Sequence, residues 1–205
     1  MRKYNKNELI VLYIMLKFKD KEMGILPLTK LLYDCELYSV DNNGERLTNY
    51  EIKHYKYGAF MKDLYETVKI FATFKENNTE EMDTSIYHIK DEYLNDKEID
   101  FSPIEKDKKL LDSVLDEWHK RCSVKKFSGN TLRGLINHTY MTEPLFDTKF
   151  NEEINLSKYD KGSGISKVLI TNREAKKISN NVKKYNDVYE DFLKGLPNWV
   201  IIAII

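Results

Sequence analysis

The chain has 205 residues, the length of one ordinary domain, and its 33 basic residues balance its 33 acidic residues. Zero net charge excludes a general electrostatic attraction to nucleic acid or anionic lipid. Hydrophobic residues make up 41% of the chain and charged residues 32%, which is typical of a globular protein with a core and excludes a membrane protein. Cys35 and Cys122 lie in apolar helix-like patterns without a CxxC pair, which favours buried thiols and a cytoplasmic location over a disulfide.

The N-terminal residues predict two helices joined by a short turn. Apolar residues recur at helical spacing over 9–16, and Asn5 or Asn7 is a candidate N-cap. Pro27 suits the first turn of a second helix, whose apolar positions fall in 28–35. Two short helices joined in this way also fit the start of a helix-turn-helix.

Two segments predict strands. Residues 50–57, which follow an Asn-Asn-Gly turn signal, alternate in polarity and place Tyr55 and Tyr57 on one face of a strand. Residues 86–91 also alternate, and we expect them to pair with 50–57. The expected fold class is therefore α+β, predominantly α-helical, with helices around a small antiparallel sheet.

Three further helices are expected after Gly58. The first has Phe60, Leu64, Val68 and Phe71 on its buried stripe, the second opens at Ser102-Pro103 and runs through Trp118, and the third is capped by Ser128 or Asn130 and ends before Pro144.

The chain is predicted to divide into three parts. Residues 1–150 form the helical domain, residues 151–170 form a polar linker around Gly162-Ser163-Gly164, and residues 171–205 form an amphipathic helix followed by an apolar tail. The tail Trp199–Ile205 is too short to span a bilayer. An exposed recognition tail and a buried edge strand or oligomer contact are both open for it, and burial is favoured because an exposed apolar segment aggregates.

The sequence contains no pattern that indicates catalysis. The four histidines have no second ligand at metal-site spacing, and no nucleophile, phosphate-loop or dinucleotide motif occurs. We therefore expect no catalytic, cofactor-binding or metal-binding residue, and a protein that is not an enzyme. A site assembled from distant residues is the enzymatic alternative.

Tyrosines supply the best candidates for contact with a partner. Tyr55 and Tyr57, with Lys56 between them, can form a contact platform, because tyrosine combines a large apolar face with a hydroxyl. The alternative is that they pack under a neighbouring helix, and the same choice applies to Tyr33 on the preceding helix. A run of lysines between 176 and 184 is either a solvated face or a phosphate-binding stripe, and the latter would fit a DNA-binding regulator.

The sequence Lys30-Leu31-Leu32-Tyr33, the strand that ends in Tyr57-Gly58, and the later Leu64-Tyr65 resemble the Panacea domain, the SocA-like antitoxin family. The resemblance covers residues 28–148. Ala59 stands where the family usually has proline, and Leu145 stands where the family has tryptophan after Pro144. His138 lies six residues before Pro144, so it takes no role from the family pattern.

The resemblance implies an antitoxin-like binding protein, or a proteolytic adaptor, of a toxin-antitoxin or prophage system. It implies a cognate toxin as partner and, for an adaptor, a Clp-type protease. The tyrosine argument above, and not the family pattern, supplies the expected partner-binding residues, which are Tyr33, Tyr55, Lys56 and Tyr57.

Overall fold

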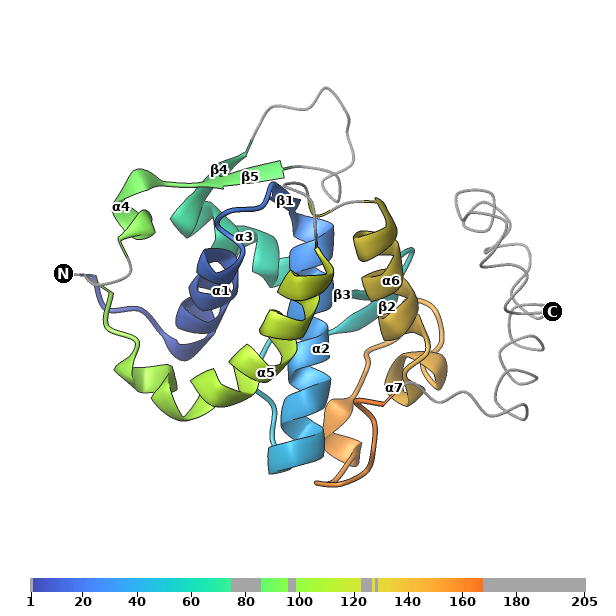
Figure 1. Ribbon diagram of the computed structural model, residues 1–205. Coiled ribbons are helices and arrows are strands. Elements are labelled where there is room, and N and C mark those ends of the chain that lie inside the picture. Colours follow the sequence, from blue (N-terminus) through green and yellow to red (C-terminus); the bar gives the residue numbers. More distant parts are fainter. Residues whose placement is uncertain (1, 75–85, 96–98, 123–126, 128, 168–205) are drawn as a thin grey trace.

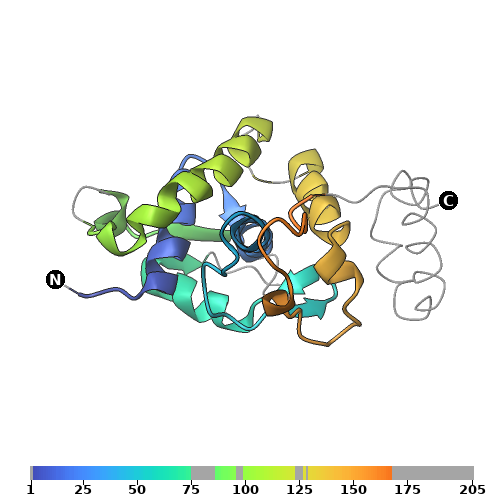
Figure 2. The ribbon, with the colours of Figure 1, turned by 90° about the horizontal axis from the view of Figure 1, so that it is seen from below.

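The computed structural model describes residues 2–74, 86–95, 99–122, 127 and 129–167. In this part of the chain, helix α2 (Ile25–Asn43) lies at the centre and the other elements surround it (Figure 1). Figure 2 shows α2 viewed along its axis, with helices on both sides of it and later segments of the domain around it. The predicted class, α+β and predominantly helical, is confirmed.

Helix α2 is central because it is buried on every face, mainly by apolar residues, and its buried charged side chains Lys30, Asp34 and Glu36 have hydrogen-bond partners. Its buried residues run from Ile25 to Val40 with few interruptions, and a helix that is hydrophobic all round belongs inside a core. The helix ends at Gly44, whose φ of 77° is the left-handed conformation that glycine adopts most easily. It therefore continues into the segment that the Asn-Gly pattern predicts as a turn.

The burial of α2 contradicts the helix-turn-helix interpretation of the N-terminal residues. A recognition helix must present one side to a DNA groove. Helix α2 is instead covered by α1 (Lys6–Lys17), α5 (Glu105–Arg121) and α6 (Gly129–Tyr140). The lysines of 176–184 and the C-terminal tail lie outside the described residues.

Helix α1 begins as its sequence predicts, whereas α3 (Lys62–Phe71) begins later than expected but buries the predicted stripe. Asn5 caps α1 in a reciprocal capping box with Glu8, which satisfies two backbone N–H groups at the start of the helix. In α3 the stripe of Leu64, Val68 and Phe71 is buried. Phe60, the fourth predicted member of that stripe, lies in a strand before the helix.

Three strands form one antiparallel sheet, in the order β1 (Met23–Gly24), β5 (Ile86–Ile89), β4 (Ala72–Phe74). Tyr87 of β5 lies opposite Met23 on one side and Phe74 on the other. Both sides of β5 are therefore occupied by partners other than residues 50–57.

A separate two-stranded sheet joins β2 (Lys53–Tyr55) and β3 (Gly58–Phe60). The predicted pairing of 50–57 with 86–91 is wrong, because the chain turns after Tyr55 and pairs with its own continuation. Lys56 and Tyr57 form the turn, so Tyr55 and Tyr57 do not share a strand face.

The remaining elements of the domain follow α3 and its strand. A short helix α4 (Asp91–Leu94) and a 3₁₀ turn η3 (Ser102–Ile104) precede α5, which ends shortly after Trp118. Helix α7 (Glu143–Phe146) contains Pro144 in its first turn, so this proline opens a helix.

Residues 151–167 pack onto the domain, so the prediction of a linker is wrong for them. Ile154, Leu156 and Ile165 are buried, and Leu156 opens a second 3₁₀ turn, η4 (Leu156–Lys158). The Asp41 carboxylate accepts hydrogen bonds from the Gly164 N–H at 2.6 Å and from the Ser166 hydroxyl at 2.5 Å. These contacts fix the Gly-Ser-Gly segment against the end of α2.

Candidate functional site

The β2–β3 hairpin carries three of the four residues that the sequence predicts for partner contact. Tyr55 is 44% exposed, Lys56 is exposed and Tyr57 is half-buried. The Tyr55 ring stacks on Phe150 with centroids 5.6 Å apart, and the Lys56 ammonium lies 5.4 Å from the centroid of the Tyr57 ring. The structure therefore places an aromatic and cationic surface at the tip of this hairpin.

Tyr33, the fourth predicted residue, does not belong to this surface. Its side chain is completely buried in α2, and its hydroxyl lies 3.3 Å from the Thr142 hydroxyl. Burial raises the pKa of Tyr33 above its ordinary value, so the phenol stays neutral. Contact with a partner is excluded by burial, and the alternative of core packing holds.

Lys30 connects the two segments on which the family resemblance is based. This lysine of α2 is buried, and its Nζ donates a hydrogen bond to the Ala59 carbonyl at 2.7 Å. The first strand residue, Gly58, has a φ of 87°, and a Cβ there would lie 3.4 Å from Lys30 Nζ and 3.1 Å from Leu145 Cδ2. Glycine is required at this position both by its φ and by the close approach of its neighbours.

The inner side of the hairpin rests on α6 and on the segment after α7. The Tyr140 hydroxyl donates to the Lys56 carbonyl at 3.0 Å, and His54 Nδ1 lies 2.7 Å from the Thr148 carbonyl oxygen. The imidazole packs edge-on against Tyr140 and Phe150. These contacts hold β2 and the start of the turn against α6 and the segment after α7.

The surroundings of His54 favour the neutral form of its imidazole. Burial lowers its pKa below the ordinary value, and the positive charge of Lys30 lowers it further, against the opposing effect of the bond to Thr148. A neutral imidazole with its proton on Nδ1 is the form that can donate to the Thr148 carbonyl.

The outer edge of β2 is covered by the residues that follow Phe150. The His54 N–H donates to the Glu152 carbonyl at 3.0 Å, and the Asn151 N–H donates to the His54 carbonyl at 2.7 Å. The Ile154 N–H donates to the Ile52 carbonyl at 2.7 Å. Residues 151–154 therefore lie alongside β2 as an irregular third strand.

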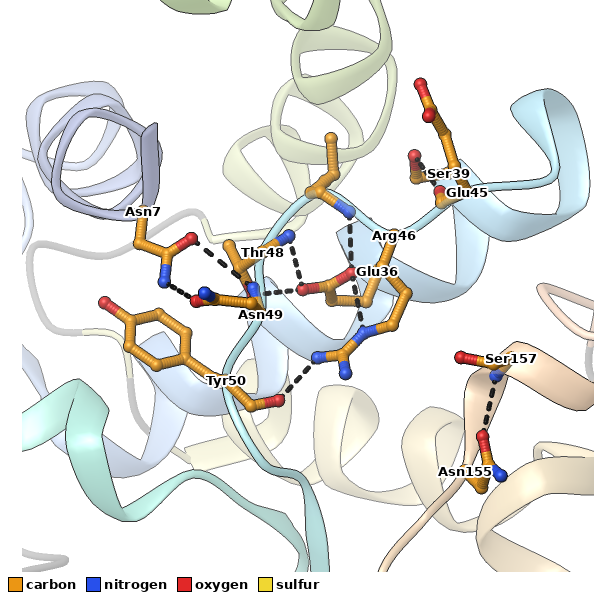
Figure 3. A network of polar contacts seen from close by, with 11 residues as sticks. Asn7, Glu36, Ser39, Glu45, Arg46, Thr48, Asn49, Tyr50, Asn155 and Ser157 are labelled. Atoms are coloured by element: carbon orange, nitrogen blue, oxygen red, sulfur yellow. Dashed lines mark hydrogen bonds and ion pairs between the residues drawn. The ribbon is translucent and has the colours of Figure 1, made fainter. Parts of the chain in front are cut away.

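The chain that leads from α2 into β2 is fixed by a buried carboxylate (Figure 3). Glu36 accepts the N–H groups of Leu47 at 2.8 Å and Thr48 at 3.0 Å, and it also accepts the Thr48 hydroxyl. Arg46 Nε lies 3.5 Å from the same carboxylate, and its Nη2 donates to the Tyr50 carbonyl at 2.6 Å. This network sets the path by which the chain enters the hairpin.

A second buried carboxylate joins three helices behind the hairpin. Asp34 of α2 accepts the Trp118 indole N–H of α5 at 2.6 Å and lies 2.9 Å from Nε2 of His138 in α6. His138 therefore contributes to the packing of α6 on α2 through Asp34, although the family pattern assigns it no role. The chain separation between these residues explains why sequence patterns miss the contact.

A shallow pocket opens between the hairpin and the first half of α2. Its described lining residues are Leu26, Thr29, Lys30, Tyr55, Tyr57, Gly58, Ala59 and Phe60. Sequence reasoning finds the tyrosines but misses Lys30. A lysine among the leucines of an apolar helix was the available signal, because lysine is seldom buried without a specific partner.

Among the described residues, no group of three or more His, Cys, Asp and Glu side chains is placed to hold a metal ion. A membrane-crossing helix, long and apolar enough for a bilayer, is likewise not found in the described ranges.

The fold and the site define a predominantly helical α+β domain that displays an aromatic hairpin. The chain belongs to the antitoxin SocA-like family with a Panacea domain, because the model of that family matches residues 28–194, well over half of the chain. The match confirms the resemblance seen in the sequence and extends it beyond residue 148. No curated protein and no solved structure gives a match.

Proposed function

We propose that this chain is an antitoxin that neutralises a cognate toxin by direct protein–protein contact. The observation that supports the proposal is the family match over residues 28–194. A second step, in which the chain delivers the bound toxin to a Clp-type protease in the cytoplasm, is the finer form of the proposal and is supported by the family resemblance.

We assign the toxin contact to Tyr55, Lys56 and Tyr57. Tyrosine side chains contribute much of the binding energy at protein interfaces, since they offer a large amphipathic surface and lose little entropy when they are fixed. Bonds from Lys30 and Tyr140 to the hairpin backbone hold these side chains in place before binding. Such preorganisation lowers the entropic cost of association.

Co-expression with the product of the neighbouring reading frame tests the proposal. The wild-type chain should restore growth and co-purify with the toxic product, whereas Tyr57→Ala should reduce both. Tyr65→Ala is a matched control, because Tyr65 is a half-buried tyrosine of α3 with Lys69 Nζ 4.4 Å from its ring centroid, as Lys56 lies near Tyr57.

Three outcomes separate the parts of this proposal. A non-toxic neighbour and the absence of any co-purified protein would contradict the antitoxin function. A folded Tyr57→Ala variant with full rescue would contradict the hairpin assignment alone. If the half-life of the toxin is unchanged by removal of the host Clp protease, the adaptor step is wrong and neutralisation occurs by contact.

A further inference from the structure

We propose that residues 151–167 form a strap that opens as a unit separate from the helices, and that the Asp41 carboxylate is the latch that keeps the strap closed. The strap begins beside β2 and ends beside the last turn of α2 (Figure 1). This conformational device goes beyond the proposed antitoxin function and does not depend on it.

The strap is held to the domain by few buried side chains. Most of its residues are exposed, and those that are buried are Ile154, Leu156 and Ile165. Its regular structure consists of the short turn η4 and one bridge between Lys53 and Glu153. A segment with few buried apolar contacts opens at a lower free energy than the core that it covers. The helices beneath the strap can therefore stay folded when it opens.

The first end of the strap is held by backbone groups. Three hydrogen bonds join residues 151–154 to the backbone of Ile52 and His54. These bonds cover the outer edge of β2, and Phe150, just before the strap, stacks on Tyr55. Release of this end would leave the hairpin without its third strand.

The second end of the strap is held by one residue of α2. All hydrogen bonds from residues 155–167 to the rest of the described chain end at Asp41. Its backbone carbonyl accepts the Gly162 N–H at 2.7 Å. Its carboxylate accepts the Gly164 N–H at 2.6 Å and the Ser166 hydroxyl at 2.5 Å. A single side chain therefore controls this end.

The position of Asp41 distinguishes a latch from an ordinary helix residue. Asp41 lies in the last turn of α2, where a negative charge is unfavourable because a helix carries a partial negative charge at its carbonyl end. Burial also disfavours the carboxylate, yet the hydrogen bonds from Ser166 and Gly164 outweigh burial and lower the pKa of Asp41 below its ordinary value. Loss of the carboxylate should therefore loosen the strap and leave α2 intact.

Hydrogen exchange of single backbone amides, measured by NMR on the full chain, tests the latch. Asp41→Ala should speed exchange of the Gly162 amide at least roughly tenfold, because hydrogen bonds to a charged group are lost. The Gly162 amide is a suitable reporter, since its own acceptor is the Asp41 backbone carbonyl, which the substitution keeps. Asp160→Ala is the matched control, because Asp160 is an exposed acid of the strap whose loss should change exchange by about twofold or less.

A milder variant tests the same contact and serves if Asp41→Ala is not folded by circular dichroism. Ser166→Ala removes the hydroxyl donor to the carboxylate, so it should speed Gly162 exchange by less than Asp41→Ala. It should have little further effect in the Asp41→Ala background, because the two residues act through one contact. In both variants the Ile154 amide should also exchange faster, while the amides of α1 should change by about twofold or less.

The pattern of exchange decides the outcome. Faster exchange at Gly162 and Ile154 together, with α1 unchanged, supports the strap and its latch. Unchanged exchange at Gly162 in the folded variants overturns the latch. Faster exchange at Gly162 alone would mean that the two ends open separately, and an equal rise in α1 would mean that the whole domain opens; either result overturns the strap as one unit. The antitoxin function is tested by toxin rescue and is not affected by any of these results.

Discussion

The Glu36 carboxylate is fully buried and is surrounded by donors from the segment that follows α2. Glu36→Ala should lower the free energy of unfolding by roughly 3–5 kcal/mol, because it removes the ion-pair partner of Arg46 and leaves the backbone N–H groups of Leu47 and Thr48 without their acceptor. Urea denaturation followed by circular dichroism measures this change. Glu45→Ala is the control, since the Glu45 side chain is 63% exposed and its loss should cost about 0.5 kcal/mol or less. Equal effects of the two variants would contradict the importance of the buried network.

His54 should make stability depend on pH in the mildly acidic range. Its pKa is lowered in the folded protein from an ordinary value of 6.5, so below that pH the unfolded chain binds the proton more strongly. The stability that neutral His54 provides is present above pH 6.5 and is lost as the pH falls toward the lowered pKa.

Denaturation at several pH values between about 7.5 and 5 measures the loss of stability that burial of neutral His54 predicts. His54→Gln, which keeps a donor for the Thr148 carbonyl, should flatten the profile in this range. His88→Gln at an exposed strand position should leave the profile as it is. A wild-type profile that His54→Gln does not change would show that other groups cause the dependence.

At the level of elements, the hairpin depends on close packing at Gly58. Gly58→Ala should destabilise the protein more than Gly162→Ala, although both glycines have φ near 80°. Strain alone costs about 1–2 kcal/mol at each position. At Gly58 the added Cβ also meets Leu145, Tyr140 and Lys30, whereas at Gly162 nothing lies within 4 Å. The loss of unfolding free energy in Gly58→Ala minus the loss in Gly162→Ala measures the packing contribution at Gly58. Equal losses in the two variants would contradict such a contribution.

The helices were predictable because their apolar positions and caps are local. The Asn5 cap and the stripe of Leu64, Val68 and Phe71 need only neighbouring residues to be recognised. The hairpin is not predicted because its turn, Lys56-Tyr57, lacks the usual Asn-Gly or Asp-Gly signal. The alternating pattern of residues 50–57 includes the two turn residues, so it predicts one continuous strand. The sequence left partner contact and core packing both open for Tyr33, because its hydroxyl partner, Thr142, is 109 residues away and no local pattern decides between them.

At the scale of the whole molecule, residues 151–167 complete the core that the preceding helices leave open. Ile154→Ala should lower the free energy of unfolding by roughly 2–5 kcal/mol, because Ile154 is 1% exposed and its removal leaves a cavity. Leu94→Ala is the control, since Leu94 is 40% exposed and its loss should cost about 1 kcal/mol or less. Thermal or urea unfolding of both variants gives the comparison. A cost for Ile154→Ala as small as for Leu94→Ala would restore the linker interpretation.

The buried lysine of α2 also limits how this protein can be recognised. Residues 151–154 bond the outward backbone groups of His54, and the Lys30 ammonium occupies the carbonyl of Ala59, which is paired with His54 across the hairpin. The two-stranded sheet is thus blocked on both sides against addition of a foreign strand, a common route to aggregation and to nonselective peptide binding. The partner contact that we propose at this hairpin would therefore be made through the side chains of the turn, and substitutions there would change its specificity without a change in the backbone.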